Sequence, residues 1–437
     1  MGLIGDFQHG FRQGRSCLSQ LLIYYDQLLE ILEEGHNADS LLLDLSKAFD
    51  KVDVGILSHR MKSMNITGEI GIWIHNFLND RTQRVLVDNT LSLPSNIVSG
   101  VPQGTVLGPI LFLIYIQSIS KLGLSSLLAS FADDSKILHK ISNEDDIMSL
   151  QKDLNKLFDW ETASNMAFNL KKFVWVQYGK SDELKESYNY FSKDFEHILT
   201  QSQSTRDLGI IINSDANYSD HISKICNKIS QKIGWFLRNF QDRSPEFMKF
   251  LWLTYLQPNI DYCSQLYSPN QGPLLMKLEN VLRSFTKRVK DISHLNYWER
   301  LKKLGISSVG RRFQRYKCIY TWKILNGHAQ NCGLSWEYTK KSGTLCKTKK
   351  IGKFFQTQRS HSFQWIGPRL FNALPRHIRD SKSSPSVFKS EINQFFNMIP
   401  DCPTTCDHTP VPMDPYDCAP SNSIIHWIQY LKIGERR

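Results

Sequence analysis

Two short apolar runs around a pair of carboxylates form the clearest local pattern in the chain. Leu127-Leu128-Ala129 precedes, and Ile137-Leu138 follows, the polar segment that contains Asp133 and Asp134. Such runs are typical of a β-hairpin whose tip carries the polar pair. Adjacent carboxylates repel each other, so a positive group, usually a metal ion, stabilises such a turn. Taken alone, an Asp-Asp pair is more typical of an ordinary solvated turn.

Helical and strand-like spacings alternate along the first half of the chain. Ser16 is a candidate N-cap for a helix from Leu18 to Leu32. The run Leu41-Leu42-Leu43 ends in Asp44 and predicts a buried strand with a carboxylate at its end, or a helix-capping Asp. The remaining pattern predicts helices at 56–61, 69–78 and 143–163, an apolar helix after the 99–109 loop through residue 119, strands at 81–87, 93–98, 173–177 and 208–212, and a loop or short hairpin at 179–203.

The second half of the chain is basic and reads as helical. The net charge is +11, yet residues 1–220 contain 19 Lys and Arg against 28 Asp and Glu. Residues 221–330 contain 19 against 6, and residues 331–437 contain 15 against 8. This asymmetry indicates cation binding in the first half and polyanion binding in the second, although any single basic residue is more typical of a solvated helix face. A last apolar helix is expected at 424–433.

Composition and cysteine usage are those of an ordinary globular protein. With 437 residues, of which 41% are hydrophobic and 22% charged, the chain has room for two or three domains. Nine scattered cysteines indicate reduced thiols, no secretory signal is visible, and the apolar stretch at 106–119 is too short to span a bilayer. We therefore expect an intracellular protein, nuclear or cytoplasmic, without a membrane partner. A zinc site is an open alternative at Cys402, Cys406, His408 and Cys418, whose spacing matches no common zinc module.

Three carboxylates are candidates for a metal site. Asp44 follows one predicted strand, and Asp133 and Asp134 lie on the hairpin tip. If these strands are neighbours in one antiparallel sheet, the carboxylates converge, and oxygen ligands favour a hard ion such as Mg²⁺. Two such ions would activate a 3′-hydroxyl and neutralise a departing pyrophosphate. Spacing alone leaves this as one option among several.

The order of the segments resembles that of reverse transcriptases of non-long-terminal-repeat (non-LTR) retrotransposons, close to the jockey group of mobile elements. Gln8 to Arg12 with Arg15-Ser16 resembles the second fingers motif, and Leu43 to Asp50 resembles the palm motif with the first catalytic aspartate. Ser99 to Pro109 resembles the loop beside the incoming nucleotide, and Phe131 to Asp134 resembles the catalytic pair. Further resemblances lie at Asn169 with Lys172, at 207–209 with His221, at Tyr255, Pro258, Tyr262 and Cys263, and at 286–288, 297–301, 311–312, 372–375 and 388–389.

The resemblance implies an α+β fold, the right-hand polymerase. Residues 1–215 would form a palm, an antiparallel sheet with packed helices, together with partial fingers. Residues 216–330 would form a helical thumb and basic region, and residues 331–437 a C-terminal region whose structure the resemblance does not specify.

The activity implied by the resemblance is RNA-directed DNA polymerisation. Its partners would be an RNA template, a DNA primer and deoxynucleoside triphosphates (dNTPs), and no oligomeric state is indicated. Asp44, Asp133 and Asp134 would hold two Mg²⁺ ions, with Mn²⁺ as an alternative. Phe49 would be the steric gate, a bulky ring that excludes a 2′-hydroxyl by clash.

The remaining roles implied by the resemblance concern the nucleotide. Gln103 and Gly104 would shape the pocket for nucleotide and template. Arg12 and Arg15 would contact triphosphate or template phosphate. Lys172 would assist pyrophosphate departure, with Lys171 beside it as the alternative in register.

Departures from the family pattern keep other interpretations open. The first fingers motif and the endonuclease domain of complete elements have no counterpart here, and Phe173 stands where the lysine motif normally continues with cysteine. We therefore expect an N-terminally truncated copy. The alternative is a catalytically inactive remnant that at most binds nucleic acid through its basic half. A group-II-intron-type maturase shares the palm motifs, but the jockey-like residues after position 250 argue against it.

Overall fold

The computed structural model divides the chain into two compact units. The first comprises Met1–Gln20 and Glu34–Thr205, and the second comprises Leu21–Glu33 and Arg206–Arg437. Helix α1 (Cys17–Glu33) and strand β11 (Ser204–Asp207) contribute residues to both units. The structure describes residues 4–179, 187–191, 196–269, 272–331, 336–338, 345–347, 358–401 and Ile424.

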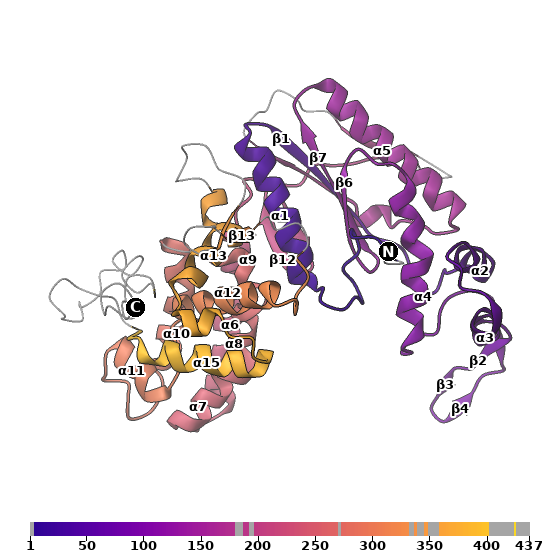
Figure 1. Ribbon diagram of the computed structural model, residues 1–437. Coiled ribbons are helices and arrows are strands. Elements are labelled where there is room, and N and C mark those ends of the chain that lie inside the picture. The colour runs from indigo at the N-terminus through magenta and orange to yellow at the C-terminus, as the bar shows by residue number, and fades with distance from the viewer. Residues whose placement is uncertain are drawn as a thin grey trace. The chain divides into compact units, whose positions relative to one another are not determined.

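An antiparallel sheet organises the first unit. Among the described residues it has four strands, in the order β6 (Leu127–Phe131), β7 (Asp134–Ile141), β1 (Asn37–Leu43) and β8 (Val174–Tyr178) (Figure 1). The predicted hairpin is confirmed as β6–β7, and β1 pairs with both β7 and β8. The strand that precedes Asp44, β1, and the strand that begins at Asp134, β7, are therefore neighbours in one antiparallel sheet, as the sequence analysis required.

The predicted helices of this unit are confirmed, with small shifts at their ends. Helix α5 begins after Asn143, whose side chain accepts a hydrogen bond from the Asp146 N–H, and it runs alongside the sheet (Figure 1). The apolar helix expected through residue 119 is an α-helix only to Ile116, and the chain continues as a 3₁₀ helix to Lys121. The helices are α2 (Val54–Ser63), α3 (Gly68–Leu78), α4 (Leu107–Ile116), η1 (Gln117–Lys121), α5 (Glu144–Ala163) and η2 (Leu170–Lys172).

The strands expected at 81–87 and 93–98 are shorter and interrupted. Pro94 has no N–H to donate to a ladder, so the outer pairing breaks next to it. At the far end, Asp88 and Asn89 take φ values of +46° and +61°, as a tight hairpin turn requires. The resulting strands are β2 (Arg81–Gln83) with β5 (Ser95–Ile97), and β3 (Leu86–Val87) with β4 (Thr90–Leu91).

Two further hairpins follow in the chain. The polar stretch at 179–203 contains the short hairpin of β9 (Asn189–Phe191) and β10 (Glu196–Ile198), one of the two predicted outcomes. The strand expected from residue 208 begins only at β12 (Ile210–Asn213). Leu208 and Gly209, at φ values of +43° and +88°, form the turn that connects it to β11 instead.

The second unit is helical, as the pattern after residue 220 predicts. One face of α6 is buried through isoleucines at helical spacing, Ile222, Ile225, Ile229 and Ile233. Farther on, Trp322 stacks on Phe388 with ring centroids 4.3 Å apart. The described elements are α6 (Ser219–Asn239), α7 (Pro245–Leu251), η3 (Trp252–Leu256), α8 (Gln257–Asp261), α9 (Ser264–Tyr267), α10 (Pro273–Thr286), α11 (Tyr297–Leu304), α12 (Val309–Leu325), β13 (Trp336–Tyr338), β14 (Leu345–Lys347), η4 (Gln358–His361), α13 (Phe363–Ala373), α14 (Arg376–Arg379) and α15 (Pro385–Met398).

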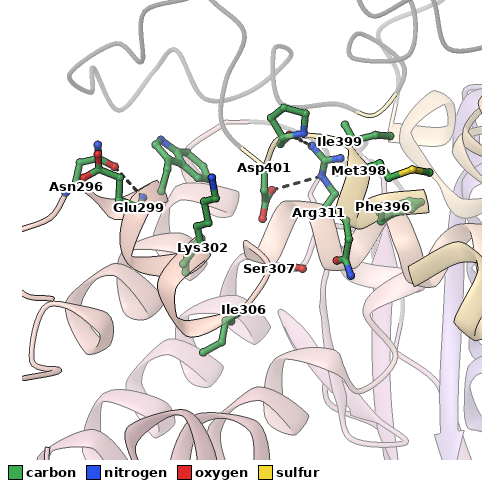
Figure 2. Close-up of a pocket in the computed structure, with 15 residues that line it drawn as sticks. Asn296, Glu299, Lys302, Ile306, Ser307, Arg311, Phe396, Met398, Ile399 and Asp401 are labelled. Atoms are coloured by element: carbon green, nitrogen blue, oxygen red, sulfur yellow. Dashed lines mark hydrogen bonds and ion pairs between the residues drawn. The ribbon is translucent and has the colours of Figure 1, made fainter. Parts of the chain in front are cut away.

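A cavity of about 630 Å³ opens in the second unit between α11 and the end of α15 (Figure 2). Asp401 lies at its wall and accepts hydrogen bonds from the N–H and hydroxyl of Ser308, at 2.6 and 2.7 Å. Arg311 lies 3.5 Å from the same carboxylate. These contacts tie the chain after α15 to the start of α12. No residue with a role predicted from the sequence lines the described part of this cavity.

Some predictions fall outside the described residues. These are the cysteine and histidine group at 402–418 and, apart from Ile424, the helix at 424–433. Within the described part of the chain, no helix has both the length and the apolar character needed to cross a membrane.

Candidate active site

The tip of the β6–β7 hairpin is a two-residue turn. Phe131 pairs with Asp134, so Ala132 and Asp133 form the turn itself. Ala132 has a φ of +56°, a left-handed conformation that favours glycine. Directly below the turn, the hydroxyls of Ser130 and Ser135 lie 2.8 Å apart and share a hydrogen bond. The sequence Ser-Phe-Ala-Asp-Asp-Ser therefore places both carboxylates at the end of the sheet.

Asp44 lies at the same end of the sheet. It directly follows β1, whose last residue, Leu43, pairs with Ser135. Continuing this antiparallel register by one residue places Asp44 opposite Asp134. The backbone carbonyl of Asp44 also accepts a hydrogen bond of 2.8 Å from the N–H of Asn169. The predicted convergence of the first aspartate on the hairpin tip is thus present in the backbone.

Lys172 supplies a positive charge to this group. Its Nζ lies 3.0 Å from Oδ2 of Asp44, and it stands at the end of the short turn η2. The hydrogen bond to Asp44 and the charge of Asp44 raise the pKa of Lys172, and Asp134 and Asp133 add to the shift. The neighbouring Lys171 is exposed. The structure therefore brings Lys172, rather than Lys171, to the carboxylates.

The negative charges at the hairpin tip repel one another. Burial raises the pKa of Asp133, and the nearby charge of Asp44 raises it further. This is the electrostatic signature of carboxylates that lack a sufficient counter-charge.

The donor chemistry of the three aspartates fits a hard divalent cation, because all their side-chain donors are oxygens and a lysine ammonium already lies against one of them. In the described residues, however, no three Asp, Glu, His or Cys side chains lie close enough to share one ion. The ligand types fit a metal ion, but the described side chains are not close enough together to bind one ion jointly.

Phe49 and the 99–109 loop lie side by side. The N–H of Val101 donates to the carbonyl of Phe49 at 2.9 Å, and the N–H of Gly100 donates to the carbonyl of Val52 at 2.8 Å. A Cβ at Gly100 would lie 2.9 Å from backbone atoms of Asp50, so only glycine permits this approach. The ring of Phe49 stacks on Phe112 with centroids 4.4 Å apart.

Gln103 and Gly104 are exposed residues of this loop. The side-chain amide of Gln103 donates to Oδ1 of Asp50 at 2.9 Å. Gly104 takes a φ of +79°, and a Cβ there would contact nothing within 4 Å. The loop that carries Gln103 and Gly104 is therefore joined to the segment around Phe49 through the bonds from Val101 to Phe49 and from Gln103 to Asp50.

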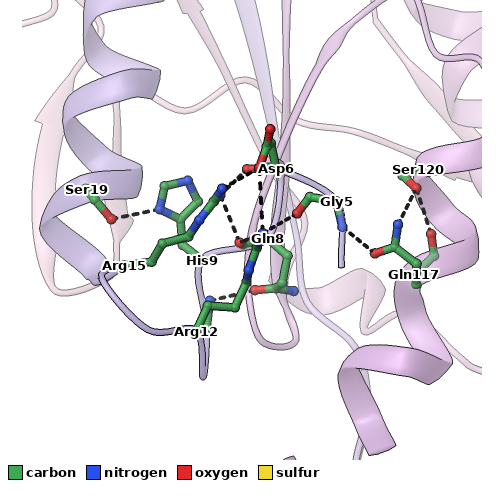
Figure 3. A network of polar contacts seen from close by, with 10 residues as sticks. Gly5, Asp6, Gln8, His9, Arg12, Arg15, Ser19, Gln117 and Ser120 are labelled. Carbon is green, nitrogen blue, oxygen red and sulfur yellow. Dashed lines mark hydrogen bonds and ion pairs between the residues drawn. The ribbon is translucent and has the colours of Figure 1, made fainter. Parts of the chain in front are cut away.

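Arg12 and Arg15 make their contacts within the first loop of the chain (Figure 3). Arg12 Nη1 donates to the carbonyls of Gly5 and Gln8, at 2.6 and 3.1 Å. Arg15 donates to the carbonyls of Asp6 and Gln8, at 2.5 and 3.2 Å, and its Nη2 lies 2.5 Å from Asp6 Oδ1. The Arg15 side chain is only 1% exposed. In this structure both guanidinium groups hold residues 5–8 in place.

His9 is held neutral in the same network. Burial, together with the charges of Arg15, Arg12 and Lys136, lowers its pKa to about 3. Its Nδ1 shares a hydrogen bond of 2.8 Å with the hydroxyl of Ser19 (Figure 3). His9 is therefore a structural polar residue rather than a proton carrier near neutral pH.

Gln8 is a residue of this region for which sequence reasoning gave no individual role. It is fully buried, and its side-chain amide contacts the backbone of Ala132 at the hairpin tip. A single glutamine carries no signal of burial in the sequence, because its contact with Ala132 spans 124 residues.

Comparisons with known proteins find similarity to RNA-directed DNA polymerases. Residues 2–212 match the family model described as reverse transcriptase (RNA-dependent DNA polymerase). The chain is 26% identical over 274 residues to the probable RNA-directed DNA polymerase from transposon X-element of Drosophila melanogaster, a match that covers 61% of this chain and 30% of the relative. It is 27% identical over 277 residues to the RNA-directed DNA polymerase from mobile element jockey of Drosophila funebris, covering 60% and 30%.

Among solved structures, the chain is similar to a telomerase from Candida tropicalis in complex with a fragment of telomeric RNA. The identity is 11% and the TM-score 0.37, with 86% of this chain and 52% of the telomerase covered. The matches to both Drosophila relatives span 30% of the relatives' own length.

Proposed function

We propose that this chain is the polymerase part of a jockey-like non-LTR retrotransposon, because residues 2–212 match the reverse transcriptase family model and the relatives include the polymerase of mobile element jockey. It would add dNTPs to a DNA primer on an RNA template. Such a polymerase would act inside the cell, in the nucleus or the cytoplasm.

One observation carries the proposal. Asp44 follows β1 and lies at the same end of the sheet as the hairpin tip that holds Asp133 and Asp134, with Lys172 against it. Three carboxylates and one ammonium at the end of an antiparallel sheet suit a reaction on phosphate groups that depends on divalent cations.

The three aspartates would hold two Mg²⁺ ions, or Mn²⁺ in their place. When bound, these ions would activate the primer 3′-hydroxyl and neutralise the departing pyrophosphate. Family members generally use divalent metal ions, and the oxygen donors of Asp44, Asp133 and Asp134 suit them.

The other predicted residues would act on the nucleotide directly. Lys172 would leave Asp44 and donate a proton to the departing pyrophosphate oxygen. Phe49, whose ring is braced by Phe112, would exclude a 2′-hydroxyl by steric clash. Gln103 and Gly104 would border the pocket for the nucleotide and the template base.

Arg12 and Arg15 would contact triphosphate or template phosphate in the same proposal. To do so, each guanidinium would have to share donors with the carbonyls that it contacts in the first loop. Since the Arg15 side chain is only 1% exposed, its contact with a phosphate would also require the first loop to move.

The polymerase assignment extends to the arrangement of the chain. Residues 1–215 would be the palm with partial fingers, residues 216–330 a helical thumb and basic region, and residues 331–437 a C-terminal region. The antiparallel sheet of the first unit and the helices of the second support this division.

A second candidate function is a catalytically silent remnant that binds nucleic acid. It is favoured by two observations: the described carboxylates do not close into a metal-binding group, and Lys172 occupies Asp44. The basic residues after position 220 would then supply salt-dependent binding to phosphates.

Primer extension on an RNA template with dNTPs and Mg²⁺ separates the two candidates. We expect incorporation by the wild-type chain, its loss in Asp133→Ala, and its retention in the matched control Asp145→Ala, which alters an exposed carboxylate. Incorporation that survives Asp133→Ala would exclude the proposed chemistry. Absence of incorporation together with salt-sensitive RNA binding would establish the remnant.

A further inference from the structure

A polar clamp contacts the back of the hairpin that carries Asp133 and Asp134. Gln8 Nε2 donates to the carbonyl of Ala132 at 3.1 Å, and the N–H of Ala132 donates back to Gln8 Oε1 at 2.8 Å. The same oxygen accepts the N–H of Gly10 at 2.7 Å. One buried side chain thus satisfies both backbone groups of the residue at the turn.

Ala132 is the residue of this turn that needs support. At a φ of +56° its Cβ is crowded against its own backbone, a conformation that glycine adopts freely and alanine rarely. Such backbone strain persists only where the surrounding structure fixes it, and it concentrates at functional sites. The paired hydrogen bonds from Gln8 are this external constraint, because they fit one orientation of the Ala132 peptide groups.

The backbone on both sides of Gln8 is also hydrogen-bonded to the hairpin. The N–H of His9 donates to the carbonyl of Ser130 at 2.9 Å, and the N–H of Ser130 donates to the carbonyl of Phe7 at 2.8 Å. A Cβ on Gly10 would lie 2.4 Å from the N atom of Ala132, so this position admits only glycine. The first loop therefore packs against the turn without intervening side chains.

Arg12 and Arg15 fix the loop from its other side. Their guanidinium groups both contact the carbonyl of Gln8, at 3.1 and 3.2 Å, and reach Gly5 and Asp6 as well (Figure 3). The chain of contacts runs from the two arginines through the Gln8 backbone to the Gln8 side chain, and from there to Ala132.

We propose that Gln8 is a positioning residue, which holds the strained Ala132 turn and thereby sets where the carboxylates of Asp133 and Asp134 stand. This inference rests on the proposed polymerase function, because it concerns the geometry of its candidate catalytic pair. Gln8 itself touches neither substrate nor metal.

The test compares Gln8→Ala, the isosteric Gln8→Glu and the matched control Gln13→Ala, which alters an exposed glutamine of the same loop. The first readout is hydrogen exchange of the peptide that covers residues 127–141, measured on the full chain by mass spectrometry. Removing one buried hydrogen-bond partner should accelerate exchange at the turn about 10-fold in Gln8→Ala and leave Gln13→Ala unchanged. This readout does not depend on activity.

The second readout is single-nucleotide incorporation. A misplaced catalytic pair should lower kcat about 10²-fold in Gln8→Ala, with the KM for dNTP nearly unchanged, since the nucleotide pocket lies on other residues. A general loss of folded protein would instead lower the active fraction and the thermal stability together.

Gln8→Glu adds a third readout, the pH dependence of its activity relative to wild type. A merely structural role of Gln8 would not produce such a dependence. An ionised carboxylate accepts from Ala132 and Gly10 but cannot donate to the Ala132 carbonyl, whereas a protonated one can. Burial raises the pKa of such a carboxyl group, while the charges of Arg12 and Arg15 against residue 8 lower it. The activity of Gln8→Glu relative to wild type should therefore rise as the pH is lowered and the carboxyl group takes up its proton.

The outcomes separate this inference from the proposed function. If the wild-type chain does not extend a primer, the polymerase proposal fails, while the exchange measurement still tests the clamp. If exchange at 127–141 is the same in Gln8→Ala and Gln13→Ala, the clamp is overturned. A pH-independent ratio of Gln8→Glu to wild type, with wild-type activity present, overturns it as well.

Discussion

The Lys172 ammonium contacts the Asp44 carboxylate because the turn that carries Lys172 is itself bonded to Asp44. The carbonyl of Asp44 accepts the N–H of Asn169 at 2.8 Å, and the carbonyl of Asn169 accepts the N–H of Lys172, also at 2.8 Å. The Lys172 ammonium then returns to Oδ2 of the same aspartate at 3.0 Å. Asp44 thus holds the lysine directly at its side chain and, through Asn169, at its backbone. The ammonium and a divalent cation would therefore compete for a single carboxylate.

This competition predicts opposite effects on metal binding and on rate. In Lys172→Ala, the Mg²⁺ concentration for half-maximal primer extension should fall a few-fold, since the competing ammonium is gone. The maximal rate should fall by about 10²-fold or more if the lysine is the proton donor. Magnesium titrations of single-nucleotide incorporation measure both quantities. Lys171→Ala, at an exposed neighbour, is the control and should match wild type.

The charge of Asp133 should lower the folding stability of the protein, although primer extension requires it. Because its folded-state pKa is raised, the folded protein holds the proton more tightly than the unfolded chain. Stability therefore falls as pH rises above the ordinary aspartate range, and the cost is fully present at neutral pH. Asp133→Asn removes the charge, so Tm should rise by about 1–2 °C while primer extension is lost. An unchanged or lower Tm, against Asp145→Asn as control, would contradict this.

Phe49→Ala should relax the choice of sugar. Removing the ring that stacks on Phe112 opens space where a 2′-hydroxyl would clash. We expect the preference for deoxynucleotides over ribonucleotides to fall by about 10- to 100-fold, measured as the ratio of kcat/KM for the two. Phe11→Ala, which removes an exposed ring in edge contact with Phe49, should change the ratio little. Equal ratios in wild type and Phe49→Ala would remove this role.

A buried carboxyl group on β1 should make the stability of the first unit depend on pH. Burial raises the pKa of Asp39 to about 6, although the Tyr188 hydroxyl donates to it. The folded state keeps this proton between the ordinary aspartate pKa of about 4 and about 6, so stability falls as pH rises through that window. Asp39→Asn cannot ionise and should be more stable than wild type by ~2 kcal/mol above pH 6. Denaturant unfolding at several pH values measures this, and parallel curves for the two proteins would refute it.

The local parts of the candidate site were predictable from the sequence, and the long-range parts were not. The hairpin around Asp133 follows from apolar runs of strand length, which local pattern encodes. Its pairing with the strand before Asp44 was stated only as a condition, because strand order depends on packing between distant segments. The helical character of the chain after residue 220 was likewise expected, although its individual helices were not placed.

The contacts that set the geometry of the site depend on tertiary structure. Neither the choice of Lys172 over Lys171 nor the burial of Gln8 against Ala132 is visible in residue types, since each contact joins segments more than 120 residues apart. Interrupted strands at 81–98 show a local limit, because Pro94 breaks the ladder in a stretch whose apolar residues favour continuous strands.

The bond between Asp401 and Ser308 has a consequence for how the second unit opens. It joins two points 93 residues apart and lies beside the contact between Asp401 and Arg311. Helix α12, which starts there, is itself fixed to the rest of the unit, because it packs on α10 and Arg312 bonds to Asp261. Local opening at the end of α15 therefore has to break two hydrogen bonds and an ion pair together, which makes that end cooperative with the start of α12.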